Sequence, residues 1–81
     1  MYNSTSLDIE FTYRGQLHKR KVDKLMFTYT AYSYTIYRLK GKTANFDLIK
    51  AGKWWQVDVV EALRPKLLEA IGDAIDRVES K

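Results

Sequence analysis

The chain has 81 residues, of which 46% are hydrophobic and 14% aromatic, and its formal net charge is +4. This length fits one small globular domain over residues 1–81. The sequence contains no cysteine, which excludes disulfides, thiolate metal sites and thiol catalysis. The N-terminal residues lack the basic and apolar segments of a signal peptide, and no apolar run reaches the roughly 20 residues that a membrane span needs. We therefore expect a cytoplasmic protein that does not bind a membrane.

A first β-hairpin is predicted near the N-terminus. Apolar and polar residues alternate from Leu7 to Arg14, as in a half-buried strand. The Arg14-Gly15 pair suits a two-residue turn because glycine accepts a positive φ. This turn places Glu10 opposite Lys19, a favourable cross-strand pair, and Asp8 opposite Lys21. The second strand, residues 16–22, is lysine-rich, which is typical of an edge strand.

Three further strands are expected. The third runs from about Met26 to Leu39, and Lys40-Gly41 then forms a two-residue turn into a fourth strand over 43–50. Ala51-Gly52 forms the next turn, into a fifth strand over 53–57.

These two turns set the expected pairing of the last three strands. The first turn pairs Tyr34 with Asp47, and the second pairs Ile49 with Trp54. A slip of one residue would move side chains to the opposite face of the sheet.

After Asp58, the spacing of the apolar residues changes from that of a strand to that of a helix, which predicts one C-terminal helix. Asp58 and Glu61 form an acidic version of a capping box. Pro65 removes a helical hydrogen bond, so either the helix kinks at Pro65 or the main helix starts there. Gly72 is unfavourable in a helix, and its expected purpose is close approach to the sheet. The fold class is therefore α+β: a four- or five-stranded antiparallel meander followed by one helix packed on one face.

One helix cannot cover both faces of this sheet. We expect the helix on the face that carries small residues of the third strand; its members are Ala31, Ser33, Thr35, Tyr37, Phe46, Leu48, Trp55 and Val57. The opposite face is also apolar, which is unusual for an antiparallel sheet. Its members are Tyr32, Tyr34, Ile36, Ile49 and Trp54, with Arg38 and Asp47 beside them. An exposed patch of this kind generally marks a contact surface.

From this patch we expect the protein to be a non-enzymatic binding module. The first hypothesis is that it self-associates as a homodimer. The alternative is single-stranded nucleic acid, whose bases stack on aromatic rings. The first 57 residues carry ten lysines and arginines against four acids, and the candidates for phosphate contacts are Arg20, Arg38, Lys40, Lys42, Lys50 and Lys53. An acidic protein partner and a patch without function also remain open.

The sequence does not predict a metal site, a phosphate-binding loop or a pair of catalytic acids. His18 is the only histidine, and a metal site needs several ligands of suitable type. The Gly41-Lys42-Thr43 triplet lacks the first glycine of a phosphate-binding loop and opens a strand instead of a helix. Two pairs of acidic residues, Asp8 with Glu10 and Asp73 with Asp76, are expected on polar faces of regular elements, where solvation and ion pairing explain them. We therefore predict neither a cofactor, a metal nor an enzymatic activity.

Overall fold

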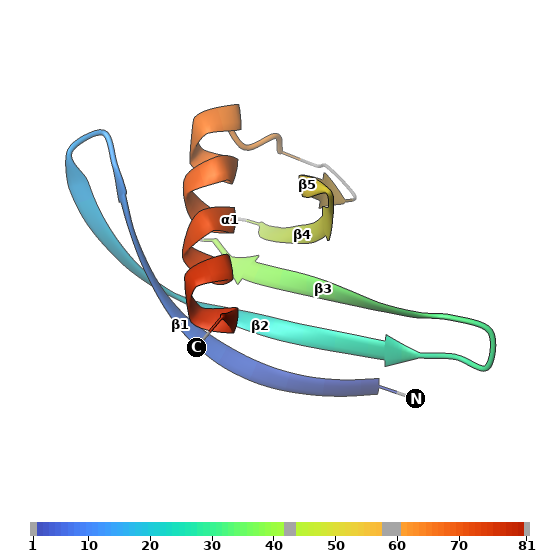
Figure 1. Ribbon diagram of the computed structural model, residues 1–81. Helices are drawn as coiled ribbons and strands as arrows, with labels where there is room; N and C mark the ends of the chain where they lie inside the picture. Colours follow the sequence, from blue (N-terminus) through green and yellow to red (C-terminus); the bar gives the residue numbers. More distant parts are fainter. Residues whose placement is uncertain (1, 42–43, 58–60, 81) are drawn as a thin grey trace.

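The computed structural model describes residues 2–41, 44–57 and 61–80, and it confirms the predicted fold class. Five antiparallel strands form one sheet in the order β1-β2-β3-β4-β5, and a C-terminal helix packs against it (Figure 1). The elements are β1 (Tyr2–Tyr13), β2 (Gln16–Thr28), β3 (Ser33–Lys40), β4 (Asn45–Ala51), β5 (Lys53–Val57) and α1 (Pro65–Glu79).

The first hairpin has the predicted register. Glu10 lies opposite Lys19 and Asp8 opposite Lys21. Arg14 and Gly15 both adopt positive φ, at 52° and 75°, as the tight turn requires. Within the described residues, the pairing of β2 with β3 begins only at Val22. The lysine-rich first half of β2 is therefore unpaired on that side, but β2 as a whole lies between β1 and β3 and is not the edge strand that was predicted.

The prediction of one continuous strand from Met26 to Leu39 is wrong. The chain turns back at residues 29–32, where the Tyr29 N–H donates to the Tyr32 carbonyl oxygen at 2.8 Å. Met26 therefore ends up in β2, opposite Thr35 of β3. Ala31 lies in this turn and not on the helix-covered face. The turn contains none of the residues that usually mark one, such as glycine, proline, asparagine or aspartate.

The register between β3 and β4 differs from the prediction by four residues. The Gly41 N–H bonds the Ala44 carbonyl oxygen at 2.9 Å, so the loop is longer than the expected two residues. Asp47 consequently lies opposite Arg38 and not Tyr34. Because the shift is an even number, every side chain of β4 stays on its predicted face.

The register between β4 and β5 differs by one residue, which exchanges the two faces of β5. A single residue, Gly52 with φ 76°, separates the strands, so Ile49 lies opposite Trp55 and Lys50 opposite Trp54. Trp54 therefore lies on the helix-covered face, whereas Trp55 and Val57 lie on the other, opposite to the prediction.

The helix begins at Pro65, the position where a proline costs least, so this residue starts α1 and does not kink it. Residues 61–64 are not helical. The predicted cap, Asp58, lies outside the described residues. Gly72 faces the sheet as expected: a Cβ atom there would lie within 3.0 Å of the Trp54 indole.

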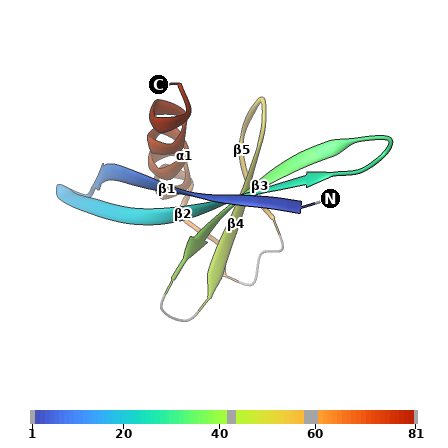
Figure 2. The same ribbon diagram turned by 90° about the horizontal axis from the view of Figure 1, so that it is seen from below.

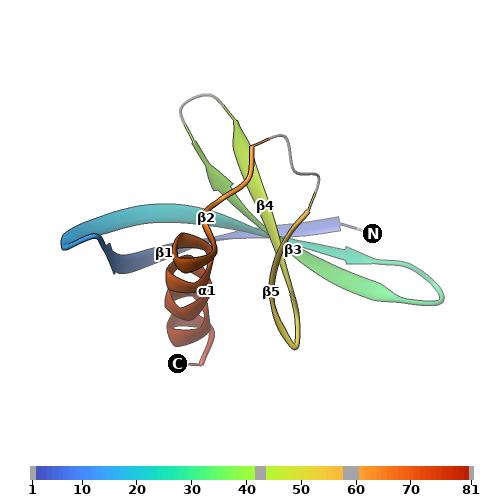
Figure 3. The ribbon, with the colours of Figure 1, turned by 90° about the horizontal axis from the view of Figure 1, so that it is seen from above.

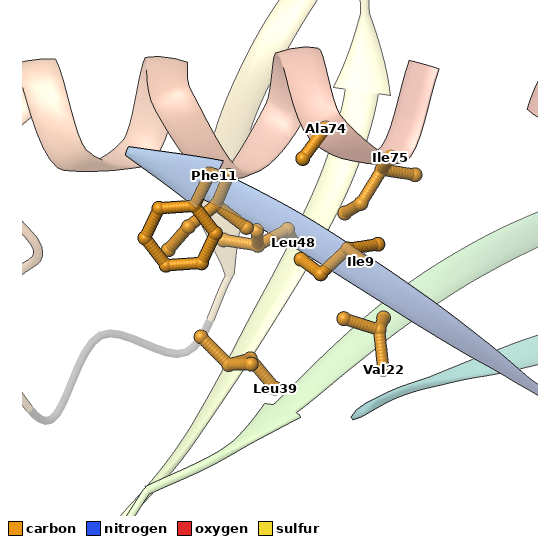
Figure 4. Close-up of a cluster of buried hydrophobic side chains, with 8 residues drawn as sticks. Ile9, Phe11, Val22, Leu39, Leu48, Ala74 and Ile75 are labelled. Carbon is orange, nitrogen blue, oxygen red and sulfur yellow. The ribbon is translucent and has the colours of Figure 1, made fainter. Parts of the chain in front are cut away.

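The hydrophobic core lies between α1 and the middle of the sheet (Figure 4). The largest fully buried side chains are Ile9, Val22, Leu48, Ile71 and Ile75. The helix packs on β1 and β5, and the turn between β2 and β3 extends well beyond it (Figure 1).

Candidate interaction surface

One end of the sheet projects away from the helix. It consists of the start of β1, the end of β2 and the start of β3 (Figure 1), and we call residues 2–7 and 25–37 the distal arm. Neither range contains a lysine, arginine, aspartate, glutamate or histidine. The distal arm is therefore an uncharged surface in a chain that is 30% charged overall.

Five aromatic rings form a continuous cluster on this arm. Phe27 stacks on Tyr34 with ring centroids 4.9 Å apart, and Tyr2 lies 5.2 Å from Phe27 on the other side. Tyr29 and Tyr32, from the turn, lie 5.0 Å from each other and 6.1 Å from Tyr34. We call these five residues the aromatic cluster. Their spacing is that of favourable aromatic pairs.

The cluster is open to solvent despite this packing. Tyr32 is 59% exposed, Tyr2 57%, Tyr29 46% and Tyr34 41%. A hydrogen bond with the Tyr29 hydroxyl raises the pKa of Tyr34 above its ordinary value, with smaller contributions from burial and the neighbouring phenols. The Tyr34 ring therefore stays neutral throughout the physiological pH range.

Sequence reasoning found Tyr32 and Tyr34 but missed the other three members of the cluster. The predicted first strand began at Leu7 and the second ended at Val22. The signal was nevertheless present, because the Arg14-Gly15 turn fixes the register of the whole hairpin. Extending that register brings Tyr2 opposite Phe27.

A hollow of about 520 Å³ adjoins the cluster. The pairing of β3 with β4 stops at Tyr37, so the β2–β3 and β4–β5 hairpins diverge from there (Figures 2 and 3). Tyr34, Ile36 and Ile49 line the hollow together. The structure therefore brings together four of the five predicted surface residues, with Tyr32 joining through the cluster.

The fifth, Trp54, belongs elsewhere. Its ring packs edge-on against Tyr37 with centroids 5.2 Å apart, and its Nε1 donates to Asp76 at 3.2 Å. Trp55 takes the open side of β5 instead, where it is 47% exposed and the Lys53 ammonium lies 4.3 Å from its ring centroid.

The predicted phosphate contacts do not gather at the aromatic cluster. Arg38 forms a two-pronged ion pair with Asp47, at 2.8 and 3.0 Å, and this carboxylate raises the pKa of Arg38 further. Lys50 binds Asp76 at 2.7 Å on the helix side. The Lys40 ammonium lies 3.8 Å from a carboxylate oxygen of Asp23. Arg20 lies near the end of the sheet that is opposite the aromatic cluster. Lys42 is outside the described residues.

The helix end is fastened to the sheet by a polar contact at the inner border of the arm. The Lys24 ammonium and the Tyr37 hydroxyl both donate to Glu79, the latter at 3.0 Å. Burial and this carboxylate raise the pKa of Tyr37 to about 12. The hydrogen bond from Lys24 lowers the pKa of Glu79. The helix thus ends against one charged partner, Lys24, and one neutral partner, Tyr37, at the point where the uncharged arm begins.

The described residues contain no group of three or more histidines and carboxylates placed to hold a metal ion. The same part of the chain has no helix long and apolar enough to cross a bilayer. Comparisons with protein-family models, with characterised proteins and with solved structures give no significant match.

Proposed function

We propose that this protein is a non-enzymatic binding module that self-associates through the distal arm. The observation that carries the proposal is the aromatic cluster: five rings in mutual contact on a surface that the helix leaves uncovered. A contiguous apolar patch of this kind on a small domain generally marks a contact surface.

The absence of charge on the arm favours a second copy as the partner. Two identical charged patches repel each other, whereas two uncharged aromatic patches associate without desolvating ions. The hydroxyl groups of the tyrosines supply hydrogen bonds at the rim of such a contact. A two-fold arrangement places the same patch on both subunits and needs no further complementary surface.

Single-stranded nucleic acid is less well supported as the partner. Binding of this kind needs cations that follow the phosphates beside the stacked bases. The arm carries no lysine or arginine, and Arg38 and Lys50 are already bound to carboxylates. Lys53 over Trp55 is the one exposed cation–aromatic pair on the open face of β5 within the described residues.

Sedimentation equilibrium at micromolar concentration tests the proposal. The unmodified chain is expected to be a dimer, and Tyr34→Lys is expected to weaken its association at least about tenfold by placing a charge in the contact. Leu17→Lys is the matched control, because Leu17 is 61% exposed on the same sheet face at the other end of β2. A monomeric unmodified chain, or equal effects of the two substitutions, would contradict the proposal.

The salt dependence of binding distinguishes a second copy of the chain from single-stranded nucleic acid as the partner. Association through an uncharged surface is expected to change less than about threefold when the salt concentration is raised tenfold. Binding of a short single-stranded oligonucleotide, measured by fluorescence anisotropy, would instead fall with a log–log slope of about −0.7 for each phosphate neutralised. Tight, steeply salt-dependent binding would replace self-association with the nucleic-acid alternative.

A further inference from the structure

A second hollow lies at the opposite end of the sheet from the distal arm. Its walls come from the β1–β2 hairpin, the end of β3, the start of β4, and the chain that leads into α1. The volume is about 630 Å³, which falls within the roughly 300–1,000 Å³ typical of small-molecule sites. We call it the proximal cavity.

The inner wall of the proximal cavity is apolar. Phe11, Leu39 and Ile71 are buried core residues, and each also lines the cavity. Figure 4 shows the Phe11 ring and Leu39 on the same side of the core. Leu63 and Leu67 add further apolar surface from the helix side. A hydrocarbon chain lying here would be removed from water on several sides.

The rim of the cavity is cationic. Arg14, Arg20, Lys40 and Arg64 line it together with a single acid, Glu61. Arg14, Arg20 and Arg64 form no ion pair with any carboxylate of the described residues. By contrast, Lys24, Arg38 and Lys50 elsewhere on the sheet are each bound to an acid. Among the described residues, three guanidinium groups without an ion-pair partner and one lysine therefore face a single acid, Glu61, around this opening, which leaves a net positive charge there.

The wall formed by residues 61–64 is held in place. The Gln56 side chain donates to the Glu61 carbonyl oxygen at 2.7 Å and accepts from the Leu63 N–H at 2.8 Å. The helix that follows starts at Pro65 with no acidic residue in its first turn and no side-chain cap. Its positive end therefore adds to the charge of the rim.

We propose that the proximal cavity binds an amphipathic organic anion: an alkyl chain with one anionic head group. The chain lies along Phe11, Leu39 and Leu67, and the head group lies among Arg14, Arg20 and Arg64. A guanidinium fork fits the oxygens of a carboxylate well. A small inorganic anion would leave the apolar wall wet, and a neutral lipid would leave the cations unpaired. This site is separate from the distal arm and does not depend on self-association.

The first experiment titrates the full-length chain with dodecanoate and follows backbone amide resonances. About 0.5 mM ligand, below micelle formation, suffices to saturate a site of micromolar affinity. We expect shifts at Gly15, Gly41 and Leu67 but not at Tyr34 of the arm. Dodecyltrimethylammonium, with the same chain and opposite charge, should leave the cavity amides unshifted. Equal shifts with both amphiphiles, or none at the cavity with dodecanoate, would overturn the proposal.

Chain length provides a second measurement on the unmodified protein. Affinity should rise roughly fourfold for each CH₂ between octanoate and dodecanoate while the added carbon is fully buried. Acetate, which has the head group alone, should produce no saturable shift. An affinity independent of chain length would place the ligand on the rim only and would contradict binding in the cavity.

A pair of double variants assigns the head-group site. Arg20→Gln with Arg64→Gln should weaken dodecanoate binding about tenfold or more, because it removes two of the three unpaired guanidinium groups. Lys21→Gln with Lys66→Gln removes the same net charge from exposed positions that do not line the cavity, and should change affinity less than about twofold. All four side chains are exposed, so the fold should persist in both proteins. Equal losses in the two double variants would mean a diffuse charge effect and would overturn the assignment.

Discussion

The two ends of this sheet differ in how much apolar surface they bury and in the charge they carry. Under α1, the sheet buries a hydrophobic core, and ion pairs such as Lys50–Asp76 and Lys24–Glu79 hold the helix at its border. Beyond that border, the distal arm has no charge and displays five aromatic rings.

The two regions should therefore respond differently to substitution. The first region satisfies its apolar and polar groups within the chain, so substitutions there should act on folding. In the second, the tyrosines of the aromatic cluster are 41–59% exposed and no described element covers them, so under the proposed self-association substitutions in the cluster should act on association and leave folding nearly unchanged.

The largest expected effect comes from the core. Ile75 is fully buried, and Ile75→Ala should lower the free energy of unfolding by about 2–5 kcal/mol, since it removes buried methyl groups and leaves a cavity. Ile75→Val should cost about 0.5–1.5 kcal/mol and provides a graded variant if alanine prevents folding. Urea titration of both variants gives the measurement.

The matched change in the arm is Tyr32→Ala. It removes a larger side chain that is 59% exposed, and monomer stability should change by no more than about 0.5 kcal/mol. If Tyr32→Ala destabilised the monomer as much as Ile75→Ala, the arm would be part of the folding core.

Gly72→Ala is expected to have an intermediate effect. The added methyl group would overlap the Trp54 indole, at a cost of about 1–3 kcal/mol, and the better helix propensity of alanine offsets about 1 kcal/mol of that cost. The net result is a loss of stability, measurable by urea titration. In a Trp54→Leu background the same substitution should become neutral or stabilising. A gain in the unmodified background would show that Trp54 does not pack on Gly72.

The smallest expected effect is a dependence of stability on pH. Hydrogen bonds from Lys24 and Lys50 lower the pKa values of Glu79 and Asp76 in the folded chain below their ordinary 4.5 and 3.8. Just below these ordinary values, the unfolded chain binds more protons than the folded one. The stabilisation from both groups is therefore complete above about pH 5 and is lost as the pH falls through their folded pKa values.

Urea midpoints from about pH 6 down to about pH 3 measure this dependence. The double variant Glu79→Gln, Asp76→Asn should show a flatter profile than the unmodified chain. Glu69→Gln with Asp73→Asn, which changes two exposed acids of the same helix without ion pairs among the described residues, should keep the original slope. Identical profiles for the two double variants would mean that the contacts with Lys24 and Lys50 add nothing to stability.

Much of the fold followed from short-range patterns in the sequence. The alternation before Arg14-Gly15 gave the first hairpin with its register, because a two-residue turn leaves only one pairing of the strands. The helical period and Pro65 gave α1, since proline is tolerated at the first helical position. The face that the helix covers was correct for β3 and β4, but the stated reason was not, because the helix packs on β1 and β5 and not on the small residues of β3.

The errors in the predicted strands came from turns whose residues do not indicate where the turn lies or how long it is. Residues 29–32 lack turn-forming side chains, yet the chain reverses there because the ends of β2 and β3 pair with each other. At Gly52 the loop is one residue shorter than expected, and this difference alone exchanged Trp54 with Trp55.

The sequence by itself determined the class of the fold, the first hairpin and the presence of more aromatic surface than one helix can cover. Only the tertiary structure decided where that surplus lies. Tyr2 and Phe27 are 25 positions apart in the sequence, and strand pairing brings them beside Tyr34 of a third strand. Arg14, Arg20 and Arg64 likewise meet at one cavity only because α1 returns to the first hairpin. Local patterns specify elements, whereas surfaces assembled from several elements depend on registers and loop lengths, where a change of one residue moves a side chain to the other face.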